Sequence, residues 1–121
     1  MQTFTVEGRL PGYNELHQSS WQKSARIKNE AMNTAIMYAL HIKPITQPVQ
    51  IRISCFEPNA KRDPDNVISG ASKVILDMLQ KYGKLPNDNR SWVRLVFDPV
   101  EVDREHPRIE VCITDRLEDL A

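Results

Sequence analysis

The sequence has few of the residues on which several common chemistries depend. Its 2 cysteines, Cys55 and Cys112, lie far apart and form no C-x-x-C pair, so neither a zinc site nor a disulfide framework is indicated, and a reduced cytoplasmic setting is expected. With only 4 glycines, the chain contains no glycine-rich phosphate loop and no G-x-S-x-G motif. Nucleoside triphosphate chemistry and nucleophilic-serine chemistry therefore have no support.

Long apolar runs are also missing. The longest, residues 35–40, is far shorter than the roughly 18 to 20 residues that a transmembrane helix needs. Residues 1–6 contain no basic patch followed by an apolar stretch. We therefore expect neither a membrane segment nor a secretory signal.

The chain has no net charge, because 16 Lys and Arg balance 16 Asp and Glu, and this argues against binding of nucleic acid by bulk positive charge. The charges are nevertheless unevenly distributed. Residues 1–62 carry 8 basic and 4 acidic side chains, whereas residues 63–121 carry 8 basic and 12 acidic ones. This asymmetry fits a phosphate-binding surface beside an acidic site that needs a cation, and it also fits a chance distribution of solvated acids.

Apolar periodicity predicts both strands and helices. Alternation of polar and apolar residues predicts strands over residues 3–7, 49–55, 92–97 and 108–114. Helical spacing predicts a helix over residues 21–40, capped by Ser19 or Ser20, and a second over residues 66–82, stopped by Gly83. Residues 10–20 are expected to form a loop. The order β-α-β-α-β-β predicts one domain over residues 1–121, of α/β (α+β) class, with a mixed β-sheet and two main helices.

An acidic cluster, Asp63-Pro64-Asp65-Asn66, precedes the second predicted helix. Pro64 biases Asp63 toward extended backbone, in which Asp63 and Asp65 point the same way. Two carboxylates aimed at one point repel each other unless a cation compensates, and their hard oxygen atoms suit Mg²⁺. Taken alone, the same four residues favour a turn in which Asp65 caps the helix.

The second predicted helix is amphipathic. Its apolar stripe comprises Ile68, Ala71, Ile75, Met78, Leu79 and Tyr82. Lys73 lies on the opposite side, about two turns beyond Asp65, so its long side chain is expected to reach back toward a phosphate near the acids. The alternative is a solvated lysine that pairs with Asp77 at i,i+4.

Other polar residues near the cluster have two interpretations as well. Asp88 is either a metal ligand from a neighbouring loop or an ordinary turn acid. Lys61 and Arg62 either hold DNA phosphates beside the cut or form a solvated basic pair.

Several motifs around this helix occur together: Lys61-Arg62-Asp63-Pro64-Asp65-Asn66, Lys73-Val74-Ile75-Leu76-Asp77-Met78-Leu79, Gly83 and Asn87-Asp88-Asn89. Together they resemble the RusA family of Holliday junction resolvases, which is common in phages and prophages. The core of the resemblance covers residues 61–93, and Leu10-Pro11-Gly12-Tyr13-Asn14-Glu15 is similar to an early Pro-x-x-Asn segment of the family. The spacing from Asp65 to Asp77 is about one helical turn longer than in the best-known enterobacterial member, and an alignment anchored on Asp77 keeps Lys73 and Asp88 in register.

The resemblance implies a RusA-like fold and a magnesium-dependent crossover junction endodeoxyribonuclease of DNA recombination and repair, with Mn²⁺ able to replace Mg²⁺, in the cytoplasm of a bacterial or phage-infected cell. It makes Asp63, Asp65 and Asp88 catalytic metal ligands and Lys73 the catalytic lysine, with Asp77 as a further candidate ligand. The candidate DNA-binding residues are Asn14, Lys23, Arg26, Lys61 and Arg62.

The expected partner is a four-way DNA junction, which is close to two-fold symmetric. Because one chain supplies one acidic site, paired cuts imply a C₂ homodimer with both sites on the same side. No other cofactor, no membrane and no further protein partner is implied. Two alternatives remain, namely a protein that binds branched DNA without cutting it and a less selective nuclease of flaps or forks.

Overall fold

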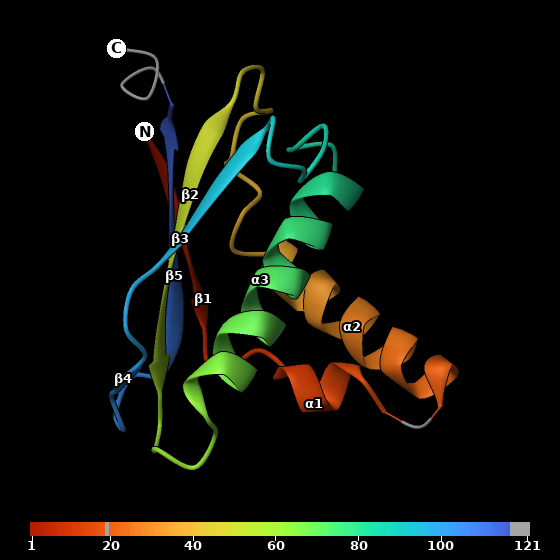
Figure 1. The fold of residues 1–121 in the computed structure, drawn as a ribbon, viewed down its shortest axis with the longest axis vertical. Coiled ribbons are helices and arrows are strands. Elements are labelled where there is room, and N and C mark those ends of the chain that lie inside the picture. The colour runs from red at the N-terminus through yellow and green to blue at the C-terminus, as the bar shows by residue number, and fades with distance from the viewer. Residues whose placement is uncertain (19, 117–121) are drawn as a thin grey trace.

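The computed structural model describes residues 1–18 and 20–116 and has a mixed sheet on which the helices pack (Figure 1). The elements are β1 (Gln2–Glu7), α1 (Tyr13–Leu16), α2 (Trp21–Ile36), β2 (Val49–Glu57), α3 (Pro64–Lys81), β3 (Val93–Phe97), β4 (Glu101–Val102) and β5 (Arg108–Asp115). The strand order is β1-β5-β2-β3, and β4 also pairs with β2. Strand β5 is antiparallel to β1 and β2, whereas β3 and β4 are parallel to β2. The predicted mixed sheet with two main helices is confirmed.

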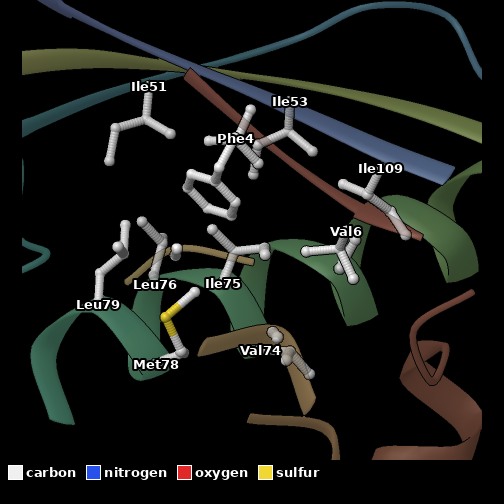
Figure 2. Packing of buried hydrophobic residues seen from close by; sticks show 14 of the residues in the cluster. Phe4, Val6, Ile51, Ile53, Val74, Ile75, Leu76, Met78, Leu79 and Ile109 are labelled. Carbon is white, nitrogen blue, oxygen red and sulfur yellow. The ribbon is translucent and has the colours of Figure 1, made fainter. Parts of the chain in front are cut away.

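All three helices lie on the same side of the sheet in Figure 1. The alternation in β2 explains this arrangement, because Ile51, Ile53 and Cys55 are buried while Arg52 between them is exposed. Figure 2 shows side chains of β1, β2 and β5 projecting toward the side chains of α3. Removal of this apolar surface from water, at about 25 cal/mol per Å², is the main driving force that holds the helices on the sheet.

The longest described helix is α3, with 18 residues, and it is buried over a broader face than its sequence predicts. The predicted stripe is right for Ala71, Ile75, Met78 and Leu79, but Ile68 is only partly buried and Tyr82 is 39% exposed. The buried face is wider because α3 contacts the sheet and also α1 and α2. Neither α3 nor any other helix of the described residues is long and apolar enough to cross a membrane.

Helix α2 begins as predicted but ends earlier. The Ser20 hydroxyl accepts a hydrogen bond from the backbone N–H of Lys23 at 3.3 Å, which is the expected cap, while Ser19 lies outside the described residues. The helix ends at Ile36 rather than at residue 40. The following backbone N–H groups bond to carbonyls three residues earlier, as in Ala39 to Ile36 at 2.9 Å, and this tighter winding turns Ala39 into the core.

A short helix, α1, occupies part of the segment that was predicted to be a loop. Its buried residue is Leu16, and its first turn is stabilised by the Glu15 carboxylate, which accepts a hydrogen bond from the Gly12 backbone N–H at 3.3 Å. One turn is too short to produce a periodic signal in the sequence. It nevertheless places residues 13–16 against α3.

Candidate active site

The acidic cluster forms the beginning of α3. Asp63 is the N-cap residue, with the extended backbone (φ −64°, ψ 147°) that a following proline favours, and Pro64 opens the helix. The predicted cap at Asp65 is wrong, because Asp65 lies inside the first turn, where its carboxylate accepts a hydrogen bond from the Asn66 backbone N–H at 2.9 Å. The Asp63 side chain forms no capping hydrogen bond either. At the start of the helix, the Asp63 carboxylate is therefore free of capping bonds, and the Asp65 carboxylate accepts one backbone hydrogen bond.

Both carboxylates line one hollow of about 280 Å³, which we call the acidic hollow. Its lining residues come from two helices and are Tyr13, Asn14, Asp63, Asp65, Asn66 and Ser69. Asp63 and Asp65 are exposed, and they form no ion pair with any residue in the described ranges 1–18 and 20–116. The sequence grouped Asn66 with the two acids, but it gave no indication that Tyr13 and Ser69 are their neighbours.

Two glycines allow α1 to approach α3 so closely. A Cβ atom on Gly70 would lie 2.0 Å from the backbone oxygen of Pro11, and a Cβ atom on Gly12 would lie 2.7 Å from the side-chain nitrogen of Asn66. The Asn66 side-chain oxygen in turn accepts a hydrogen bond from the Asn14 backbone N–H at 2.9 Å. The two segments that carry the resemblance, residues 10–15 and 61–66, are thus held against each other.

A buried ion cluster fixes the chain that leads into the acids. Glu57 is 3% exposed at the end of β2, on the inward side of the strand. Its carboxylate accepts hydrogen bonds from Arg62 at 2.8 and 2.9 Å and from Arg9 at 2.8 Å. Burial would raise the pKa of the Glu57 carboxyl, but the hydrogen bonds from Arg62 and Arg9 outweigh it and hold this pKa below its ordinary value.

The same cluster changes the interpretation of Arg62, which was predicted to bind a DNA phosphate. Its remaining terminal nitrogen donates to the backbone oxygen of Leu10 at 3.0 Å and to the Glu15 carboxylate at 3.1 Å. With its donors engaged inside the protein, Arg62 holds the loop before Asp63 in place. Lys61, its neighbour, is exposed and forms no ion pair with the described residues.

Lys73 is not directed at the acids in this structure. Its ammonium lies 3.4 Å from the Asp77 carboxylate, the i,i+4 pair that the sequence left open as an alternative. The same Asp77 oxygen lies 2.6 Å from the ammonium of Lys28 on α2. Two cations thus already occupy Asp77, which argues against Asp77 as a ligand of a divalent ion.

Asp88 follows the C-terminal end of α3 in the chain, whereas Asp63 and Asp65 lie at the beginning of this helix. The 18 residues of α3 extend over about 27 Å at 1.5 Å per residue, so Asp88 does not join Asp63 and Asp65 within one chain. In the described part of the chain, no three His, Cys, Asp or Glu side chains gather as a metal centre. Asp88 instead lines a second hollow of about 470 Å³ with Leu76, Arg90, Val93, Arg94, Leu95 and Arg116.

The other candidate DNA contacts lie on the helical layer. Lys23 and Arg26 are exposed on α2, and Asn14 is exposed on α1 at the acidic hollow. Helix α1 contacts both α2 and α3, which carries the two acids at its beginning (Figure 1).

No protein-family model matches the chain, and a search of curated proteins finds no match.

The close contact at Gly70 predicts that Gly70→Ala destabilises the protein by about 1 to 3 kcal/mol, because the new methyl group overlaps the backbone at Pro11. Urea unfolding measures the change. Ser72→Ala, on the same helix, is the control and should unfold within about 0.5 kcal/mol of the wild-type protein. Unchanged unfolding of Gly70→Ala would show that α1 does not pack on α3 in this way.

The ion cluster predicts a pH-dependent effect of Glu57→Gln. Because the pKa of Glu57 is lower in the folded than in the unfolded protein, its contribution is present above the ordinary value of 4.5 and is lost as the pH falls through the lowered value. At pH 7 we expect a loss of about 3 to 5 kcal/mol, since two arginines lose their partner. The difference from wild type should shrink below pH 4.5, measured by urea unfolding. Glu110→Gln, at a half-exposed surface pair, should cost less than about 1 kcal/mol, and an equal loss there would contradict the assignment.

Proposed function

We propose that this chain is a magnesium-dependent endodeoxyribonuclease of the RusA type, which resolves four-way DNA junctions by paired phosphodiester hydrolysis in recombination and repair. The observation that carries the proposal is the acidic hollow, where two exposed carboxylates lie together and form no ion pair with the described residues. A bacterial or phage-infected cytoplasm is the setting that this substrate implies.

The donor set of the acidic hollow suits Mg²⁺ chemically. Asp63, Asp65, Asn66 and Ser69 all offer oxygen atoms there, and Mg²⁺ is commonly held by one or two carboxylates together with water and substrate phosphate. When bound, the ion supplies charge stabilisation to the phosphate and lowers the pKa of the attacking water. Mn²⁺ prefers the same ligand type and is expected to replace it.

The protein's own residues have separate roles in this proposal. Asp63 and Asp65 hold the cation, while Glu57 and Arg62 keep the loop before Asp63 in place. Asn14, Lys61, Lys23 and Arg26 position the DNA through its backbone, which carries no sequence information by itself. Lys73 neutralises negative charge that develops on the phosphate.

The proposed homodimer offers a place for Asp88 in the site. A two-fold axis that is perpendicular to α3 and passes close to its middle would place the far end of one α3 beside the beginning of the other. Asp88 of the partner subunit would then approach Asp63 and Asp65. Each site would be complete only in the dimer, which couples cleavage to the two-fold symmetry of the junction.

Asp65→Asn tests the acidic hollow. We expect cleavage of a synthetic four-way junction in Mg²⁺ to fall by at least about 100-fold, because a ligand charge is lost, while junction binding in EDTA is retained. Flap, fork and linear duplex substrates measured in parallel separate a resolvase from a less selective nuclease. Cutting by Asp65→Asn at the wild-type rate would reject the site, and Mg²⁺-independent binding without any cutting by wild type would favour a non-cleaving binding protein.

Mixing two inactive variants tests the shared site. Each proposed site takes Asp65 from one chain and Asp88 from the other. In a mixed dimer of Asp65→Asn and Asp88→Asn chains, one of the two sites therefore keeps both aspartates and the other carries both substitutions. We therefore expect the mixture to nick junctions at a single strand, although each variant alone is inactive. If the mixture stays inactive while mass measurements show mixed dimers, Asp88 does not act across the interface.

A further inference from the structure

The cluster of Lys28, Lys73 and Asp77 between α2 and α3 is asymmetric. Asp77 is largely sheltered, with 17% of its side chain exposed, and the Lys28 ammonium is its closer partner at 2.6 Å, with 32% of the Lys28 side chain exposed. The Lys73 ammonium is farther away at 3.4 Å, and 56% of its side chain is exposed. An exposed i,i+4 pair of this kind is worth only about 0.3 to 0.5 kcal/mol.

Loss of the ion pair with Lys28 and loss of the ion pair with Lys73 therefore have different effects on Asp77. If Lys73 leaves, Asp77 remains paired with Lys28 and stays compensated. If Lys28 is absent, Lys73 is the one remaining cation of the described residues that pairs with the largely sheltered Asp77 carboxylate, and loss of that pair would leave the charge unpaired, which is costly. Lys28 thus determines how tightly Asp77 retains Lys73.

The position of Lys73 on α3 gives it a second possible partner. Ser69 lies one turn before Lys73 and lines the acidic hollow, while Asp77 lies one turn after it. Residues four apart on a helix are neighbours on its surface. Lys73 thus stands between the hollow and Asp77 and can turn toward either.

We infer that Lys28 is the resident counter-ion of Asp77 and thereby leaves Lys73 free to bind a DNA backbone phosphate at the acidic hollow. The inference rests on the proposed function and makes Lys28 a positioning residue that acts through Lys73. It also gives Asp77 a role that involves no metal. Asp77→Asn, which releases both lysines, should accordingly keep junction cleavage, whereas a metal ligand would lose it.

The test compares Lys28→Met, Lys73→Met and the double variant Lys28→Met/Asp77→Asn. Binding to a four-way junction is measured in EDTA as a function of salt, cleavage is measured in Mg²⁺, and urea unfolding shows that each variant is folded. Lys73→Met should lower the slope of log K against log salt by about 0.9, because one phosphate contact is lost. Lys28→Met should weaken binding and slow cleavage about fivefold, equivalent to about 1 kcal/mol, because Asp77 now retains Lys73.

The double variant is decisive. Removal of the Asp77 charge should restore binding and cleavage to near the wild-type values, because nothing then retains Lys73. If the double variant is as impaired as Lys28→Met, or if Lys28→Met equals wild type, the inference is overturned. Lys43→Met removes the same charge from an exposed loop residue and should leave both measurements unchanged.

Failure of the proposed function appears separately, in the wild-type protein. If wild type binds the junction but does not cut it, the nuclease assignment fails, and the binding slopes still decide the role of Lys28. If wild type neither binds nor cuts, the inference falls together with the proposed function.

Discussion

The contact between Gly70 and the backbone at Pro11 and Gly12 determines where α1 can lie, and the acidic hollow depends on that position. Any other residue at Gly70 would force the two segments to shift apart, because a Cβ atom there would overlap the Pro11 oxygen. With α1 in this position, Tyr13 and Asn14 form one wall of the hollow, and the beginning of α3 forms the other. The hollow that Asp63 and Asp65 line is thus formed by a contact between two backbone segments and not by packing of the acids themselves.

Strands β1, β2, β3 and β5 and helix α3 were predictable because their signals are local, whereas the two-residue strand β4 was not predicted. Period-two alternation located β2, and Gly83, with φ 73°, ends the turn after α3 as expected. The end of α2 was not predictable from periodicity, because its last apolar residues continue into tighter turns that serve the core equally well. Pro64 correctly indicated extended backbone at Asp63, but α3 begins at Pro64, two residues before the predicted start at Asn66.

The partners of the charged residues were harder to predict. In the sequence, Arg62 follows Lys61 and looks like part of a solvated basic pair. In the structure, β2 extends to Glu57, whose side chain is buried and pairs with Arg62. Lys28 and Asp77 meet only because α2 packs on α3, a contact between residues far apart in sequence. The acids themselves were recognisable by motif, yet their distance from Asp88 depends on the full length of α3.

The burial of Glu57 also has a consequence for how β2 pairs with its neighbours. A shift of one residue along the sheet turns every side chain of a strand to the opposite face. Such a shift in β2 would move Arg52 and Ser54 into the apolar layer and turn Glu57 away from Arg62 and Arg9. In the observed register Glu57 pairs with Arg62 and Arg9, and in a shifted register it would lose both partners. Glu57 therefore favours the correct register of β2 more strongly than its Val and Ile side chains would alone. Glu57 therefore has two structural effects: it holds the loop before Asp63 in place and it favours the observed register of β2.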